Sequence, residues 1–173
     1  MEFFLIEVDS NYIAPCPKNC NILLWRNVES IEKFVRLPKH IILRIENHMQ
    51  MVYTDLIMYP NFCVTEKVKE AMELFQPGVY FKRIILYNKE RKKSMPYYMP
   101  LLETVDCFTE NTIYNADRSV IHRAQIDSEM IGGRIFFRAG GVKCNCILGR
   151  LDFVESLLKR NVLGLGLKEV LMK

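Results

Sequence analysis

Two pairs of cysteines stand at spacings that a metal ion could use. Cys16 and Cys20 are separated by three residues, and Cys144 and Cys146 are separated by one. Four thiolates can bind zinc tetrahedrally, and on a strand Cys144 and Cys146 would point to the same face. Zinc sites more often pair cysteines as Cys-x-x-Cys, however, and a reduced cysteine also serves as a small buried apolar side chain. We therefore predict no metal and no other cofactor, and we keep a zinc site at these four cysteines as the alternative.

The side chains that most often carry acid–base or nucleophilic catalysis are present but match no catalytic motif. His40, His48 and His122 do not form the His-Glu-x-x-His pattern, and no Gly-x-Ser-x-Gly supplies an activated serine. We predict no catalytic residue and therefore no enzyme. The alternative is an enzyme whose site brings His40 or His122 together with carboxylates from distant parts of the chain. The candidate carboxylates are Asp55, Glu103, Asp106, Glu110, Asp117 and Asp127.

Residues 88–98 combine four cations with two tyrosines and are the most suggestive binding feature. Cations beside aromatic rings bind single-stranded nucleic acid, but arginine and tyrosine are equally common at the centres of protein interfaces. A solvated hairpin loop would also explain the charges. A nucleic-acid-binding module that uses Lys89–Tyr98 stays as an alternative function. The residues that we predict to contact a partner are Arg91, Lys92, Lys93, Tyr97 and Tyr98.

The composition of residues 1–173 is that of a single folded domain. Half of the residues are apolar and a quarter are charged, which is ordinary for a globular protein. The formal net charge of +4 and the pI of about 8.7 fall short of a typical nucleic-acid-binding domain. No apolar run approaches the roughly 20 residues of a membrane helix, and the first residues lack the positive start of a signal peptide. We expect a cytoplasmic protein with reduced cysteines, no nucleic-acid partner and no membrane partner, and the oligomeric state is left open.

Two segments have the pattern of amphipathic helices. Residues 66–75 follow Thr65, whose hydroxyl can cap the first turn, and apolar residues recur there at three- and four-residue steps. Residues 152–160 begin with Asp152 and Glu155, which have the spacing of a capping box. The apolar side of this second helix consists of Val154, Leu157 and Leu158.

Most of the remaining chain has the pattern of strands separated by turns. The clearest strands are 3–8, 53–59, 79–87 and 97–105, with residues 88–96 as a polar hairpin loop. The weaker segments are 22–25, 119–126, 134–138, 143–148 and 167–171 as strands, 29–34 as a helical turn, and 41–45 as a strand or a helix. Because strands and helices do not alternate regularly, we predict an α+β domain. It would have a largely antiparallel or mixed sheet with two main helices packed on it.

Several segments in residues 51–173 resemble one family, whereas residues 1–50 carry little of the resemblance. The shared features are an aspartate before an apolar pair, a helix that starts with Val-Thr-Glu, an aromatic doublet in a strand, and a last helix that runs into an Asn-x-x-Gly turn. This order resembles the bacterial polymorphic-toxin immunity proteins of the imm-eleven type. The segments are Tyr53–Ile57, Phe62–Glu70, Val79–Lys82, Tyr97–Cys107 and Val154–Leu165.

The resemblance implies a bacterial protein that binds and neutralises a cognate toxin made by the same cell, without catalysis of its own. It carries over no catalytic residue and does not identify the face that binds the toxin. The mild positive charge would suit an acidic toxin surface, since complementary charges speed association and exclude wrong partners. We therefore expect an immunity protein whose partner is a cognate protein toxin.

Overall fold

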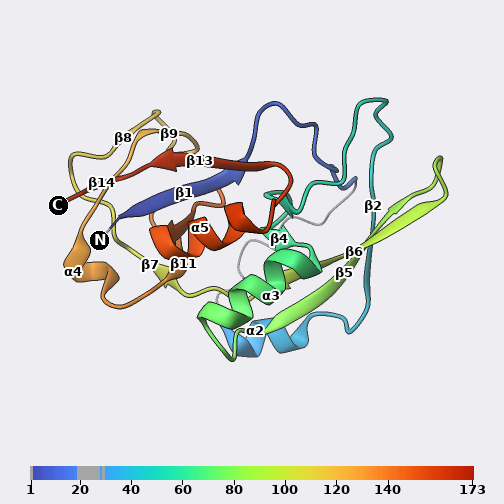
Figure 1. The fold of residues 1–173 in the computed structure, drawn as a ribbon, viewed down its shortest axis with the longest axis horizontal. Helices are drawn as coiled ribbons and strands as arrows, with labels where there is room; N and C mark the ends of the chain where they lie inside the picture. The colour runs from blue at the N-terminus through green and yellow to red at the C-terminus, as the bar shows by residue number, and fades with distance from the viewer. Residues whose placement is uncertain (1, 19–27, 29) are drawn as a thin grey trace.

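Two five-stranded sheets form the frame of the computed structural model, which describes residues 2–18, 28 and 30–173 (Figure 1). The first sheet has the order β13 (Leu165–Glu169), β1 (Phe3–Val8), β12 (Ile147–Arg150), β11 (Phe136–Ala139) and β7 (Thr104–Val105). The second has the order β2 (Ile41–Arg44), β5 (Phe81–Asn88), β6 (Lys93–Pro100), β4 (Cys63–Val64) and β3 (Leu56–Ile57). Each sheet contains one parallel pair, β7 with β11 and β2 with β5, so both sheets are mixed.

Smaller elements complete the fold. Two-stranded sheets pair β8 (Ile113–Tyr114) with β9 (Ile121–Arg123), and β10 (Gln125–Ile126) with β14 (Leu171–Met172). The helices of the described residues are α2 (Ile31–Arg36), α3 (Glu66–Phe75), α4 (Ser128–Ile131) and α5 (Leu151–Lys159). The predicted α+β class is confirmed. The prediction of one sheet with two helices was too simple, because the strands divide into several sheets.

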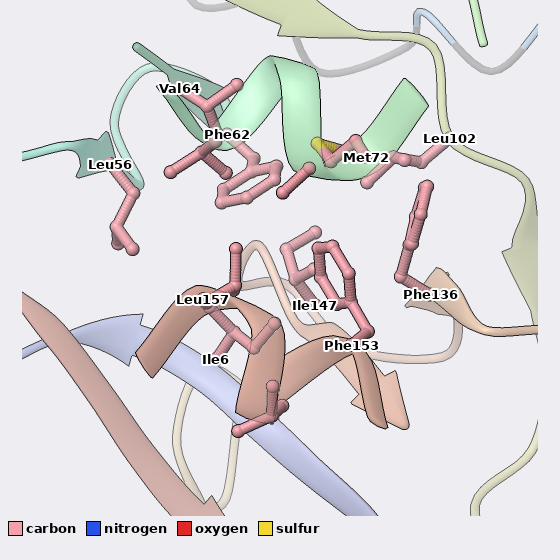
Figure 2. Packing of buried hydrophobic residues seen from close by; sticks show 13 residues of the cluster. Ile6, Leu56, Phe62, Val64, Met72, Leu102, Phe136, Ile147, Phe153 and Leu157 are labelled. Atoms are coloured by element: carbon pink, nitrogen blue, oxygen red, sulfur yellow. The ribbon is translucent and has the colours of Figure 1, made fainter. Parts of the chain in front are cut away.

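Helices α3 and α5 pack against each other through the largest apolar cluster (Figure 2). Val68 and Met72 of α3 and Phe153 and Leu157 of α5 are each at most 2% exposed. These residues repeat at steps of four, which places them on one face of each helix. Leu158 lies one residue further round α5 and is 53% exposed, so its predicted place on the apolar side was wrong.

Two further apolar clusters cover the remaining buried surface of the sheets. One includes Phe34 from α2 together with Ile84 from β5 and Tyr97 from β6, and it belongs to the second sheet. The other includes Ile131 from α4 together with Phe137 from β11, and it belongs to the first sheet. No helix of the described residues has the length and apolar character needed to cross a membrane.

Helix α3 has the predicted boundaries and Thr65 stands at its N-cap, but the predicted capping contacts of both helices were wrong. The Thr65 hydroxyl makes no cap hydrogen bond and donates instead to Asp55. Helix α5 begins at Leu151, with Arg150 as the capping residue. The Asp152 carboxylate lies inside this first turn, where it accepts hydrogen bonds from the Arg150 guanidinium and from the Phe153 backbone N–H. The Thr65 hydroxyl thus binds Asp55 and not its own helix, and the Asp152 carboxylate binds Arg150 and does not form a capping box with Glu155.

Several strand boundaries differ from the prediction. The expected strand 53–59 is reduced to Leu56–Ile57, because the Asp55 backbone N–H donates to the Leu163 carbonyl and not to a neighbouring strand. The hairpin loop predicted at residues 88–96 is shorter, since strand pairing continues to Asn88 and Lys93. The ambiguous residues 41–45 contain strand β2. The predicted strand at 22–25 and the first residue of the helical turn at 29–34 lie outside the described residues.

Candidate functional site

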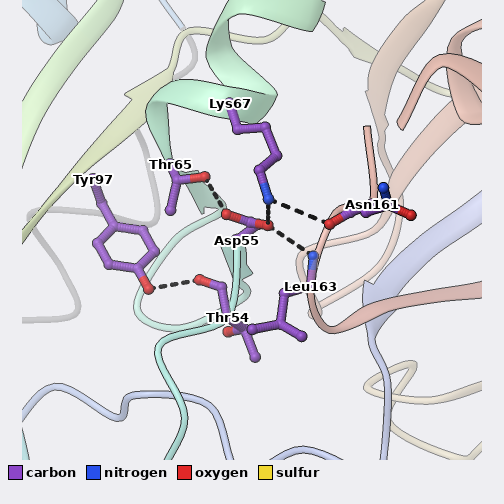
Figure 3. A network of polar contacts seen from close by, with 7 residues as sticks. All are labelled: Thr54, Asp55, Thr65, Lys67, Tyr97, Asn161 and Leu163. Atoms are coloured by element: carbon purple, nitrogen blue, oxygen red, sulfur yellow. Dashed lines mark hydrogen bonds and ion pairs between the residues drawn. The ribbon is translucent and has the colours of Figure 1, made fainter. Parts of the chain in front are cut away.

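A nearly buried carboxylate ties three distant segments together (Figure 3). The Thr65 hydroxyl donates to Oδ1 of Asp55 over 2.7 Å. The Lys67 ammonium and the Leu163 backbone N–H donate to Oδ2 over 2.8 and 2.7 Å. The backbone repeats these links, because the Asp55 N–H donates to the Leu163 carbonyl and the Thr65 N–H donates to the Asp55 carbonyl. The start of α3 and the loop after α5 are thus fixed to one residue.

The environment of Asp55 favours the ionised form of the carboxylate. Burial acts to raise the pKa of the Asp55 carboxyl, but the donors from Leu163, Lys67 and Thr65 outweigh it and lower the pKa. The Asp55 side chain is 12% exposed and the Lys67 side chain is 43% exposed. Solvent therefore reaches the Lys67 ammonium and weakens its attraction to the carboxylate. A lowered pKa suits a structural anchor, whereas a general acid or base works best with a pKa near the working pH.

Tyr97 extends this network to strand β6, and Gly164 packs against it from the loop after α5. The Tyr97 hydroxyl donates to the Thr54 carbonyl over 2.6 Å, and the Tyr97 ring is fully buried in the second sheet. Gly164 has a φ of +77°, and a Cβ atom there would lie 2.5 Å from the Thr54 Cγ2 atom. Only glycine fits this position without strain. The prediction that Tyr97 contacts a partner was wrong, because its side chain points into the core.

The basic hairpin tip is held to a neighbouring loop by Arg91. The Arg91 guanidinium donates to the carbonyls of His48 and Met49 over 2.7 and 3.2 Å, and to the Asn47 Oδ1 atom over 2.9 Å. The buried Asn88 side chain accepts from the Arg91 backbone N–H and donates to the same Asn47 oxygen. The hairpin and the 47–51 loop therefore form one structural unit, and this unit projects at the right of Figure 1.

The predicted partner residues divide between this tip and other parts of the fold. Lys92 is exposed at the turn, and the Lys93 ammonium lies 4.7 Å from the centre of the Tyr53 ring. Tyr98 is half-buried on the other face of β6, where it hydrogen-bonds Glu66 and lies under the Lys69 ammonium. Successive strand residues face opposite sides, so the two tyrosines could not share one surface with the cations. Tyr97 and Tyr98 therefore do not supply the aromatic platform on which the nucleic-acid alternative was based.

A cleft of about 820 Å³ lies against the first sheet and is the natural place for an enzymatic site. Its lining includes Asp106, Arg138 and the Glu7–Lys168 ion pair. A smaller cleft of about 470 Å³ is also lined by Asp106, together with Glu110. No histidine is among the described residues that line either cleft, and all three histidines are exposed.

The carboxylates and histidines of the enzyme alternative are thus only partly brought together. Of the predicted carboxylates, Asp106 and Glu110 share the smaller cleft. Asp55 is occupied by the buried network, and Glu103 forms an ion pair with Arg134. Asp117 pairs with Lys143, and Asp127 caps α4. Most of these groups therefore have structural partners.

The cysteine pairs do not meet in the described part of the chain. Cys16 belongs to a segment that bridges β2, because Pro17 pairs with Ile45. Cys144 and Cys146 belong to the apolar cluster of the first sheet, where burial raises the pKa of both thiols. Within residues 2–18, 28 and 30–173, no three metal-binding side chains gather around a common point. Cys16, Cys144 and Cys146 are therefore not brought together, and the zinc alternative stays untested because Cys20 lies outside the described residues.

A scan against known protein families and a search of characterised proteins give no match to this chain. The segments that carry the resemblance described above nevertheless meet in space. Asp55, Thr65, Tyr97, Asn161 and Gly164 come from four of these segments, and all of them belong to or adjoin the network in Figure 3. Sequence reasoning missed this meeting, and it also missed the 47–51 loop beside the hairpin.

Proposed function

We propose that this chain is an immunity-type protein that binds and neutralises a cognate bacterial toxin in the cytoplasm of the cell that makes both. The observation that carries the proposal is the convergence of Asp55, Thr65, Tyr97 and the Asn161–Gly164 turn in one buried network. Residues scattered over a hundred positions of sequence behave there as one structural unit. Segments that a family shares are expected to hold its common fold together. The convergence therefore supports treating these segments as one family pattern.

Binding without catalysis is the mode of action that fits these observations. Most of the candidate acid–base groups already have structural partners, whereas the hairpin tip presents cations that are not paired with acids among the described residues. A bound protein can block a toxin's active site or hold the toxin in an inactive form. Exposed charges at such an interface mainly set the rate of association and the choice of partner.

Co-expression with the product of the neighbouring gene tests this proposal. We expect that product to stop the growth of a bacterial host and this chain to restore it. A tagged copy of the chain should then retain the toxin at a ratio of one to one. Failure to restore growth, together with failure to form a complex, would contradict the proposal.

The stoichiometry of protection separates binding from catalysis. If the chain acts by binding, purified toxin should be inhibited in proportion to the amount of chain added and reach full inhibition at equimolar amounts. The toxin recovered from the complex should keep its original mass. Full inhibition at a small fraction of the toxin concentration, or a change in toxin mass, would instead indicate an enzyme.

A further inference from the structure

The 47–51 loop is held in place by a residue 43 positions away from it in the sequence. Arg91 donates to three of its backbone carbonyls, those of His48, Met49 and Met51, over 2.7 to 3.4 Å. The Met51 backbone N–H also donates to the His48 carbonyl and closes the loop on itself. A guanidinium has five donors in a fixed planar fork, so it can satisfy several carbonyls at once. An otherwise exposed loop thereby acquires a defined backbone shape.

The loop presents a methionine to solvent beside the hairpin. Met49 is 94% exposed, the largest exposed fraction among the large apolar side chains of the described residues. A single exposed apolar side chain needs no explanation by itself. Here, however, its own carbonyl is one of the groups that Arg91 holds. Because the backbone is fixed in advance, burying this side chain against a partner would need less ordering of the loop. The flexible thioether adapts to apolar recesses of irregular shape.

The hairpin turn that holds the loop of this methionine is rich in cations. The hairpin turn contains Lys89, Lys92 and Lys93 beside Arg91, against the single acid Glu90. No acidic group within the described residues lies in ion-pair distance of these four cations. Unpaired like charges on one turn repel one another, and a negatively charged partner relieves that repulsion.

We propose that Met49, Lys89, Lys92 and Lys93 form one docking surface, the tip surface, for an acidic protein surface that offers an apolar recess to Met49. Arg91 holds the 47–51 loop, which contains Met49, to the hairpin turn, which contains the lysines. Arg91 is not itself the main contact with the partner. This inference rests on the proposed function, since the toxin is the partner that it assigns. A protein is favoured over nucleic acid because the exposed anchor, Met49, has no ring on which a base could stack, and Tyr97 and Tyr98 do not lie on the tip surface.

Binding kinetics with matched variants test the tip surface. The probe is the product of the neighbouring gene, inactivated and purified, and the chain is immobilised through a C-terminal tag, because the C-terminus lies far from the hairpin in Figure 1. Met49→Ala should speed dissociation about tenfold or more with little change in association. Val35→Ala is the control, since Val35 is also exposed, at 66%, but lies on α2. It should leave both rates within about twofold of wild type.

Charge reversal tests the cationic half of the tip surface. Lys89→Glu combined with Lys92→Glu should slow association about tenfold at low salt and flatten the dependence of the association rate on salt. Lys159→Glu reverses a charge that is 79% exposed on α5 and should have a much smaller effect. All of these positions are exposed, so thermal unfolding should show that each variant keeps the wild-type fold.

Arg91→Lys separates the hydrogen bonds that Arg91 makes to the 47–51 loop from its positive charge. The substitution keeps the positive charge but loses the planar fork, so it should speed dissociation as Met49→Ala does. Hydrogen exchange of the 47–51 backbone amides should also become faster in Arg91→Lys, which a residue acting only by charge would not cause.

Three outcomes would overturn the inference. If wild type binds the probe and Met49→Ala and the lysine variants bind equally well, the tip surface is wrong while the proposed function stands. If wild type does not bind the probe, the proposed function and the assigned partner both fall. If the lysine variants lose binding only to a single-stranded DNA 20-mer, the surface belongs to nucleic acid and the protein partner is wrong.

Discussion

Replacing Asp55 by alanine should remove the anchor that joins the start of α3 to the loop after α5. The carboxylate accepts three hydrogen bonds, from Thr65, Lys67 and Leu163. The alanine variant would leave the Leu163 N–H and the Thr65 hydroxyl without this acceptor in a largely buried site. A buried donor that has lost its acceptor is paired neither with the protein nor with water. Removing the acceptor therefore costs more than the average contribution of a hydrogen bond suggests.

The expected loss of stability follows from those three contacts. Hydrogen bonds to a charged group contribute about 1.5–3 kcal/mol each, but Lys67 is 43% exposed and its ion pair contributes only about 0–1 kcal/mol. The hydrogen bonds from Thr65 and Leu163 therefore set the expected cost, and Asp55→Ala should lose about 3–6 kcal/mol. Asp55→Asn keeps the shape and one acceptor oxygen and should cost about 1–2 kcal/mol. Lys67→Met should cost less than about 1 kcal/mol.

Urea unfolding followed by circular dichroism measures these differences, with an unchanged m-value as the sign that the folded state is preserved. The dependence on pH gives an independent check. The pKa of Asp55 is lowered in the folded protein, so its contribution is complete above the unfolded-state pKa of about 3.9 and is lost as the pH falls through the folded value. Wild type should therefore be more stable than Asp55→Asn by a constant amount near neutral pH. The difference should disappear in acid.

Asp106 supplies the control, because it is an exposed carboxylate, and Asp106→Ala should change stability by less than about 0.5 kcal/mol. Two results would refute the reasoning. The first is an Asp55→Ala variant that loses no more stability than Lys67→Met. The second is an Asp55→Asn variant whose difference from wild type persists unchanged throughout the acid range, because a loss independent of ionisation cannot come from the carboxylate charge.

Three further predictions concern buried groups. Gly164→Ala should destabilise the protein by about 1–2 kcal/mol or more in thermal or urea unfolding, because a φ of +77° strains alanine and its Cβ would meet Thr54; equal stability would show that the turn can relax. Tyr97→Phe should cost about 1–2 kcal/mol through the lost hydrogen bond to the Thr54 carbonyl, while affinity for the partner stays unchanged. Cys146 should resist a thiol reagent at pH 8 in the folded protein while Cys16 reacts, because Cys146 is buried with a strongly raised thiol pKa and Cys16 is exposed; mass spectrometry of the labelled peptides would reveal the opposite order.

The elements that the sequence predicted well are those whose signal is local. The repeat of apolar residues at three- and four-residue steps located α3 at its observed ends. The polar turn between two strand-like runs located the hairpin, but the strand predicted at 97–105 was wrong in its bounds, because β6 is Lys93–Pro100 and Thr104–Val105 belong to β7. The division of the strands into two mixed sheets carries no comparable signal, since parallel pairs such as β2 with β5 join segments that are far apart in the sequence.

The candidate binding residues, too, were predicted only where the signal is local. Arg91, Lys92 and Lys93 stand out in the sequence because they are clustered charges, and they do lie at the hairpin tip. Period-two alternation already implied that Tyr97 and Tyr98 face opposite sides, and this signal was available but unused. Met49 offered no signal, because its exposure depends on a loop that Arg91 holds from 42 positions away.

The sequence by itself determined the α+β class, the boundaries of α3, the hairpin and its charge, because each depends on neighbouring residues. Only the tertiary structure decided what the polar side chains do. The Thr65 hydroxyl had the right chemistry to cap its own helix, yet it donates to Asp55, because folding brings a buried carboxylate within 2.7 Å of it. An ionised acceptor makes a stronger hydrogen bond than a neutral one, and its position is set by packing over the whole chain.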